Sequence, residues 1–283
     1  MVMDAGAAIL EKIATRQAIV AVVGMGYVGL PLTVAFAEAG FRVVGIDVDK
    51  RRVSGLNAGR SHVSDVPAQR IADLLVPLSS LHRRQVLAKS VGAAPRNGDH
   101  EAADEGVRQR TGSLSVTTDF SMLSEVDAVI ICVPTPLDTT KDPDMSYIIA
   151  VTDEIAHHLN PGMLIVLEST TYPGTTEELI LPRLEQAQPH GHEPGNGHGP
   201  ASASRSPMVV GRDFFLAFSP ERIDPGRTDY TVKTTPKVIG GVTPTCLQVS
   251  QALYECAIER VVPVSRPKTA ELVKLLENTF RAV

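Results

Sequence analysis

The chain has 283 residues, 27 basic and 32 acidic side chains and a formal net charge of −5. This acidic balance argues against a general nucleic-acid-binding surface, so we expect no nucleic acid partner. No apolar run reaches the length of a membrane span, and residues 1–17 lack the basic start of a signal peptide. Three irregularly spaced cysteines, Cys132, Cys246 and Cys256, indicate neither a disulfide framework nor a zinc site. We therefore predict a cytoplasmic chain with no membrane partner and no metal.

The first predicted unit covers residues 18–47. A short apolar run ends at three glycines spaced G-x-G-x-x-G, a helical pattern follows, and a second apolar run ends at an acid. The order of strand, glycine turn, helix, strand and acid is that of a βαβ unit that binds a dinucleotide. An ordinary glycine turn is the alternative, and the complete context argues against it. The residues expected to bind the cofactor here are Gly24, Gly26, Tyr27, Val28, Gly29 and Asp47.

Each motif residue has a physical role in this prediction. Gly24 permits the tight turn, Gly26 lets the pyrophosphate approach the backbone, and Gly29 allows the helix to pack against the strand. The start of the helix offers unpaired N–H groups to the phosphates. Asp47 can accept both ribose hydroxyls of NAD and would repel the additional phosphate of NADP.

Strands and helices continue to alternate after Asp47. Further strands are expected at residues 114–117, 128–133, 163–167, 214–218, 237–239 and 260–264. Helices are expected at residues 48–60, 68–89, 121–126, 147–159, 175–186 and 244–256, and from 268 to the chain end. The pattern predicts an α/β fold with a doubly wound, mainly parallel sheet of the Rossmann type. Residues 90–113 and 187–207 have almost no large apolar side chains and are expected to be flexible insertions.

Polar turns follow several of these strands. Thr135 stands between two prolines, and its hydroxyl either faces the cofactor or belongs to a stiff turn without a ligand. Residues 168–174 place hydroxyls, Thr170 among them, at the mouth of the expected site. Capping of the next helix by Thr175 is an alternative explanation for part of that cluster.

Two charged positions each have a functional and a purely structural interpretation. Glu221 follows a strand and is either a general base or water holder, or a partner of Arg222 in a surface ion pair. Lys274 and Asn278 lie four residues apart and share one helix face, with Glu271 one turn before Lys274. An isolated helix lysine is most often simply solvated.

Taken together, these segments resemble the UDP-glucose/GDP-mannose dehydrogenase family. The matching strings are VVGMGYVGLPL, GIDVD, ICVPTP, ESTTYPGTT, FSPERIDPG and AELVKLLENTFRA, in the order of the family and over nearly the whole chain. The resemblance is strongest to the branch acting on UDP-N-acetylhexosamines, such as UDP-N-acetylglucosamine 6-dehydrogenase. It implies oxidation of a sugar C6 alcohol to a carboxylate with two NAD per turnover, in the synthesis of polysaccharide precursors.

The resemblance also implies roles for individual residues. Thr170 and Glu221 would lie near the reacting carbon and its water, Lys274 would stabilise the oxyanion, and Asn278 would help to bind it. Thr135 and Thr170 would lie beside the cofactor. Residues 1–264 would form the NAD-binding domain, and 265–283 would begin a central helix that forms the contact of a homodimer. Pro225 stands where UDP-glucose enzymes often have a second glutamate, which argues against UDP-glucose.

The catalytic cysteine of the family lies in a G-G-x-C-x-P segment, which this sequence lacks. We therefore expect a truncated chain without the UDP-binding C-terminal domain, which binds NAD but does not form uronate alone. The alternatives are a non-catalytic NAD-binding module and a family member acting on UDP-N-acetylmannosamine, UDP-glucose or GDP-mannose.

Overall fold

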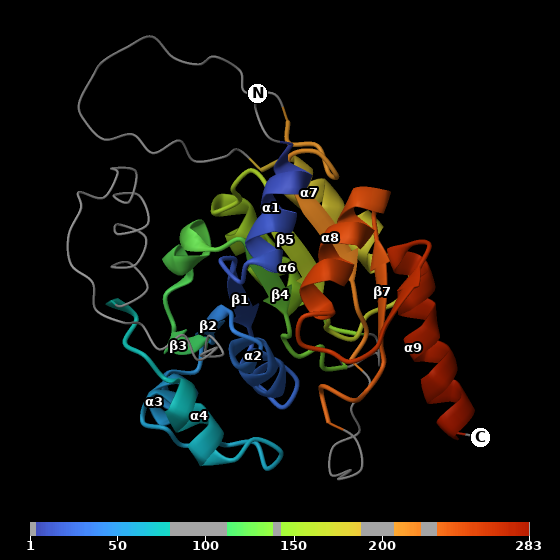
Figure 1. Cartoon of the computed structure of the whole chain (residues 1–283). Helices are drawn as coiled ribbons and strands as arrows, with labels where there is room; N and C mark the ends of the chain where they lie inside the picture. Colours follow the sequence, from blue (N-terminus) through green and yellow to red (C-terminus); the bar gives the residue numbers. More distant parts are fainter. Residues whose placement is uncertain (1–3, 80–111, 138–142, 188–206, 222–230, 283) are drawn as a thin grey trace, which may run out of the picture.

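A computed structural model describes residues 4–79, 112–137, 143–187, 207–221 and 231–282. Within this part of the chain one sheet has the strand order β3-β2-β1-β4-β5-β6-β7-β8 (Figure 1). The strands are β1 (Ile19–Val23), β2 (Arg42–Ile46), β3 (Ser113–Thr117), β4 (Ala128–Ile131), β5 (Leu164–Leu167), β6 (Phe215–Phe218), β7 (Lys237–Gly241) and β8 (Val261–Val264).

Helices cover both faces of this sheet (Figure 1). Alternate residues of β1 point to opposite faces, so Val20 and Val22 join one core and Ala21 and Val23 join the other. One core is completed by α1, α2 and α8, and the other by α6, α7 and α9. The helical elements are α1 (Ala5–Ala14), α2 (Gly29–Glu38), α3 (Lys50–Asn57), α4 (Ala68–Leu74), η1 (Phe120–Glu125), α6 (Ser146–His157), η2 (Thr175–Ile180), α7 (Leu181–Glu185), α8 (Pro244–Tyr254) and α9 (Pro267–Ala282).

The strand order reverses between β1 and β4, which lie side by side although β2 and β3 separate them in sequence. A crevice at such a reversal, beyond the carboxyl ends of the strands, is where doubly wound sheets bind their ligands. The sheet confirms the predicted Rossmann-type fold, with all neighbouring strands parallel except β6 and β7.

The antiparallel strand β7 has a direct consequence for the site. Gly240 and Gly241 pair with Phe218 and Ala217, so β7 begins at the edge of the sheet where β6 ends. Its first residue, Lys237, therefore lies beside the turn that follows β6, and its ammonium is 3.4 Å from the carboxylate of Glu221.

Three expectations from sequence require correction. The helix predicted over 68–89 is interrupted after Leu74, where Leu75 bridges to Leu114 and Pro77 disfavours helical backbone before it; residues 80–89 of that prediction lie outside the described residues. Helix α1 was not predicted, although Gly6, Ile9 and Ile13 recur at helical spacing and form its buried face. Gly112 and Ser113, placed in the first insertion, belong to the packed fold, and the Ser113 N–H donates to the Phe41 carbonyl at 3.0 Å.

The rest of the two predicted insertions, residues 90–111 and 188–206, lies outside the described residues. The same holds for Arg222 and Pro225. Among the helices that the structure does describe, none is long and apolar enough to cross a membrane. Searching the same residues finds no cluster of metal-ligating side chains.

Candidate active site

A cleft of about 630 Å³ opens at the carboxyl ends of β1, β4 and β5, at the reversal of strand order. Most of the predicted site residues line it, and they come from six separate stretches of the chain. These residues are Gly24, Gly26, Tyr27, Val28, Asp47, Thr135, Thr170, Glu221 and Lys274. Gly29 lies behind the turn, and Asn278 belongs to α9, one turn after Lys274. A larger hollow of about 1060 Å³ lies at the opposite edge of the sheet, and its described lining includes none of the predicted site residues.

The glycine turn has the shape that a dinucleotide requires. Gly24 has a φ of +96°, and an added Cβ would lie 2.5 Å from the carbonyl oxygen of Cys132. An added Cβ at Gly29 would overlap the carbonyl oxygen of Gly24. At Gly26, by contrast, an added Cβ would meet no described atom within 4 Å and would protrude into the cleft. The backbone at Gly26 is thus open to an approaching pyrophosphate, while the other two glycines are required by the fold itself.

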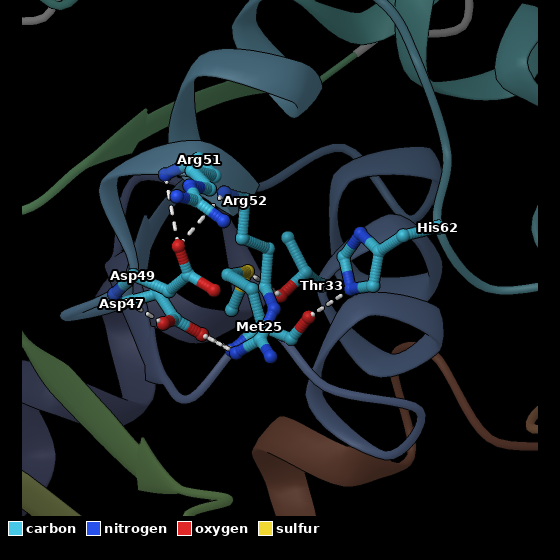
Figure 2. A network of polar contacts seen from close by, with 7 residues as sticks. All are labelled: Met25, Thr33, Asp47, Asp49, Arg51, Arg52 and His62. Carbon is cyan, nitrogen blue, oxygen red and sulfur yellow. Dashed lines mark hydrogen bonds and ion pairs between the residues drawn. The ribbon is translucent and has the colours of Figure 1, made fainter.

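Asp47 lies at the end of β2 and is buried in a polar network (Figure 2). Its Oδ2 accepts hydrogen bonds from the Met25 N–H at 2.7 Å and from the Arg52 guanidinium at 2.6 Å. Its Oδ1 accepts from the Asp49 N–H at 2.9 Å. Asp47 therefore fixes the glycine turn to α3 as well as facing the cleft. Oδ1 therefore retains acceptor capacity for a ribose hydroxyl, whereas Oδ2 already accepts two hydrogen bonds.

Arg52 and His62 also belong to this network, and neither was predicted as a site residue from the sequence. The Arg52 side chain lines the cleft beside Asp47, and the His62 Nε2 lies 2.7 Å from the carbonyl oxygen of Met25 (Figure 2). Only the position of Arg52, one turn into the helix that Asp49 caps, could have signalled its approach to Asp47. A cation at this place can hydrogen-bond to the adenosine half of a dinucleotide.

The hydroxyl-rich turn after β5 is ordered by its neighbours. Ser169 donates its hydroxyl to the Val133 carbonyl at 2.7 Å, and this contact joins the turn to the end of β4. Thr170 is exposed in the cleft, as the resemblance implies. Thr171 is buried, and its hydroxyl has no hydrogen-bond partner among the described residues.

Helix capping by Thr175 is wrong. Its hydroxyl donates to the Tyr172 carbonyl at 2.7 Å, and the free N–H groups at the start of η2 are bound by Glu271 of α9 instead. The carboxylate of Glu271 accepts from the Gly174 N–H at 2.5 Å and from the Thr176 N–H at 3.0 Å. These buried hydrogen bonds connect α9, which carries Lys274, to the turn that carries Thr170. The two segments are about 95 residues apart in the sequence.

A buried charged cluster forms the floor of the cleft at its β5 end. The Lys237 ammonium donates to Glu168 Oε2 at 2.5 Å, and the Tyr254 hydroxyl donates to Glu168 Oε1 at 2.5 Å. The Lys237 ammonium also lies 3.4 Å from the carboxylate of Glu221, so Lys237 is one partner of that glutamate. The predicted alternative partner, Arg222, lies outside the described residues. Of the four residues in this cluster, Glu168 and Glu221 line the cleft.

Burial and charge act in opposite directions within this cluster. Burial raises the pKa of Glu168, and the ammonium of Lys237 opposes that shift. Burial alone would lower the pKa of Lys237, but the carboxylates of Glu168 and Glu221 outweigh it, and the net pKa shift is upward. Burial also raises the pKa of the Tyr254 phenol well above its usual range. The cluster therefore holds the Glu168 carboxyl between the Lys237 ammonium and a neutral tyrosine, both of which donate hydrogen bonds to it.

Lys274 lies at the cleft and is not simply solvated. Burial lowers the pKa of its ammonium, while the Glu221 carboxylate opposes the shift. A partly desolvated ammonium can stabilise an oxyanion better than one in water, because its charge is less screened.

The three cysteines are free thiols. Cys132 lies at the cleft floor, and burial raises its pKa well above the usual range of a thiol. Cys246 is buried, with its Sγ 3.3 Å from the Leu216 N–H. Burial also raises the pKa of the Cys256 thiol, which packs against the core formed with α1, α2 and α8. A reactive cysteine requires a lowered thiol pKa, so none of the shifts found here produces a nucleophile.

Comparisons with known proteins agree with this geometry. Residues 18–75 and 101–258 match the UDP-glucose/GDP-mannose dehydrogenase family, NAD binding domain. A UDP-N-acetyl-D-mannosamine dehydrogenase of Pyrococcus horikoshii is 30% identical over 264 residues, which are 93% of this chain and 50% of that protein. A UDP-N-acetyl-D-glucosamine 6-dehydrogenase of Pseudomonas aeruginosa is 30% identical over 263 residues, 93% of this chain and 49% of that protein.

A solved structure shows the same relationship. The crystal structure of an NDP-N-acetyl-D-galactosaminuronic acid dehydrogenase from Methanosarcina mazei superposes with a TM-score of 0.68 at 30% identity. The match covers 96% of this chain and 50% of that one. The chain thus spans about half the length of the relatives it matches. By its sequence, its sheet and its glycine turn, the chain belongs to the UDP-glucose/GDP-mannose dehydrogenase family and carries the NAD binding domain of that family.

Proposed function

We propose that this chain serves the NAD-dependent oxidation of the C6 alcohol of a UDP-N-acetylhexosamine to the uronic acid. The observation that carries this proposal is the meeting of Thr170, Glu221 and Lys274 at one end of a cleft whose other end holds the glycine turn and Asp47. Relatives named for N-acetylhexosamine nucleotides support the substrate class.

The cleft residues divide between cofactor and substrate. Gly26, Asp47 and Arg52 would hold the adenosine and pyrophosphate of NAD, which supplies the oxidant when bound. Thr170 and Glu221 would hold the sugar hydroxyl or a water, with Glu221 accepting a proton. The Lys274 ammonium would stabilise negative charge on the substrate oxygen, with Asn278 as a second donor.

A substitution at Gly26 tests the cleft. In Gly26→Ala the new Cβ meets no described atom within 4 Å, so the fold should be retained while the methyl group blocks the pyrophosphate. We expect NAD affinity, measured by calorimetry, to fall by about tenfold or more. The matched control is Gly55→Ala in α3, which also has open space and should retain affinity within about twofold. Unchanged affinity in Gly26→Ala would contradict the proposed cofactor site.

A non-catalytic NAD-binding module is the second candidate function. The raised pKa of Cys132 favours it, because that buried thiol is the cysteine found at the cleft. Because the chain alone is not expected to form uronate, it is joined to the second half of a UDP-N-acetylhexosamine dehydrogenase that it matches. Incubating this fusion with NAD and each of four nucleotide sugars, while following NADH fluorescence, separates the two functions. NADH formed with UDP-N-acetylhexosamines in preference to UDP-glucose and GDP-mannose supports the dehydrogenase. NAD binding without NADH from any sugar supports the module.

We also propose that α9 mediates a homodimer in the cytoplasm. Leu276 and Phe280 are 72% and 84% exposed on that helix, which leaves an apolar surface for a second copy. The free thiols fit a reducing compartment. Sedimentation of the chain and of Phe280→Ser tests the dimer, which the substitution should weaken. Identical monomeric sedimentation of both would contradict it.

A further inference from the structure

One wall of the cleft is a helix face for which the proposed oxidation assigns no role. Four residues of α6 line the cleft at the spacing of a single helix face, namely Tyr147, Ala150, Val151 and Glu154. The side chain of Glu154 is exposed, and no hydrogen bond or ion pair engages it within the described part of the chain. The face therefore presents to the cleft a largely apolar surface with one acceptor group that the fold itself does not use.

The neighbouring acid, Asp153, has a different environment. Its carboxylate lies 3.6 Å from the guanidinium of Arg183 on α7, and the described lining of the cleft does not include it. Successive residues of a helix point about 100° apart, so Asp153 faces α7 while Glu154 faces the cleft. One helix thus supplies both the carboxylate of interest and a matched control.

This wall reaches the end of the cleft that takes the adenosine. Phe120, which also lines the cleft, begins η1 shortly after β3, and β3 pairs with β2, the strand that ends beside Asp47. The Asn160 amide, just beyond α6, donates to the Ser124 carbonyl of η1 at 2.7 Å, so α6 and η1 lie side by side. The wall formed by α6 and η1 therefore extends to the β2 side of the strand reversal.

The base of a dinucleotide suits this end of the cleft. With the pyrophosphate at Gly26 and the ribose at Asp47, the base continues beyond Asp47 toward Val48 and α6. Val48 is 77% exposed and Tyr147 is 48% exposed, and such surface can pack against the flat faces of a purine. The edge of adenine carries an exocyclic amino group, which donates hydrogen bonds. This placement of the base rests on the proposed NAD site.

We propose that Glu154 is a specificity-determining residue whose carboxylate accepts a hydrogen bond from the exocyclic amino group of the adenine of NAD. An ionised carboxylate has only acceptor oxygens, so it matches this donor and gains nothing from a base that lacks it. A site that hydrogen-bonds one group of its ligand discriminates against an analogue without that group. Because Glu154 is exposed, water compensates for part of a lost bond, and the expected discrimination is modest.

A dinucleotide with purine in place of adenine tests this contact, because it lacks the amino group and gains no new donor. We would measure the dissociation constants of NAD and of nicotinamide purine dinucleotide for the 283-residue chain by calorimetry. We expect the ratio of the purine constant to the NAD constant to be about fivefold larger in the wild type than in Glu154→Ala. Differences in stacking between the two bases are present in both proteins and cancel from this comparison.

The matched control is Asp153→Ala, which removes the neighbouring carboxylate from the same helix. Its ratio should stay within about twofold of the wild-type ratio. Both substitutions place alanine, the strongest helix former, at exposed positions of α6, so neither should disturb the fold. A general charge effect of Glu154 would change the binding of both dinucleotides equally and would leave the ratio at the wild-type value.

The outcomes separate this inference from the proposed function. An unchanged ratio in Glu154→Ala, or a fall of the same size in Asp153→Ala, overturns the contact of Glu154 with adenine and leaves the NAD site intact. Failure of the wild-type chain to bind either dinucleotide overturns the proposed function, and with it the premise of this inference.

Discussion

Removing the carboxylate of Glu271 should loosen the connection between α9 and the turn that carries Thr170. Its Oε2 accepts from the Gly174 N–H at 2.5 Å, and its Oε1 accepts from the N–H and the hydroxyl of Thr176 at 3.0 and 2.7 Å. Glu271 is 1% exposed, so water cannot readily replace these bonds. The start of η2 would then retain buried N–H groups without an acceptor.

The hydrogen bonds set the size of the effect. A hydrogen bond to a charged acceptor contributes about 1.5–3 kcal/mol, and an unpaired buried donor costs about 1–3 kcal/mol. Glu271→Gln keeps one oxygen for Thr176 and loses the bond from Gly174, which should lower the free energy of unfolding by about 2 kcal/mol. Glu271→Ala leaves three donors unpaired, and we expect a loss of about 4 kcal/mol because neighbouring contributions are not additive.

Urea unfolding followed by circular dichroism measures these losses. The matched control is Glu255→Gln on α8, an exposed carboxylate that accepts from the Gln251 amide at 2.7 Å. We expect that control to lose less than about 0.5 kcal/mol. A loss of the same small size in Glu271→Gln would refute the assignment of Glu271 as the acceptor for η2.

Three further predictions concern charge. By calorimetry the chain should bind NAD in preference to NADP, and Asp47→Ala should weaken NAD binding by about 1.5–3 kcal/mol; equal affinity of the wild type for both cofactors would contradict the role of Asp47. Because burial lowers the pKa of Lys274, its ammonium should titrate below the usual 10.5. NMR after reductive methylation, with the signal assigned by Lys274→Arg, measures the titration, and a midpoint at or above 10.5 would contradict the burial of Lys274. Burial raises the pKa of Glu38, but Arg70 and Lys233 outweigh it and hold the pKa below 4.5. The ionised Glu38 therefore contributes to the free energy of unfolding above pH 4.5, and this contribution is lost as the pH falls through the folded-state pKa. Glu38→Gln should therefore be less stable at neutral pH and lose less stability below pH 4.5, and urea unfolding curves that parallel the wild type at every pH would contradict this.

The sequence was most informative where structure depends on neighbouring residues. The glycine turn, the helix that follows it and Asp47 lie within residues 18–47, and backbone geometry alone dictates their spacing. The end of α4 at Leu74 was not predicted, since it depends on the bridge from Leu75 to the distant Leu114; α1 was missed although its buried face recurs at helical spacing. The reversed strand β7 likewise has no local signal that sets its direction.

The site shows the same limit. Thr170, Glu221 and Lys274 could be selected because each belongs to a motif, and the structure brings all of them to the cleft. The residues that hold them in place could not be selected from the sequence. Lys237 begins an ordinary strand, and the sequence shows no partner for Glu271. Their partners are Glu168 and Thr176, and such long-range charge pairs leave no periodic pattern in the chain.

The reversal of β7 also determines when the site can form during folding. The bonds from Lys237 and Tyr254 to Glu168 join residues 69 and 86 positions apart, whereas the bond from Met25 in the glycine turn to Asp47 joins residues 22 positions apart. Contacts of long sequence separation require a larger loss of chain entropy before they are made. We expect the phosphate-binding turn to become structured early and the charged floor late, after β7 has docked against β6. Each newly folded molecule would then pass through a stage with a formed glycine turn and no intact charged floor at the β5 end of the cleft.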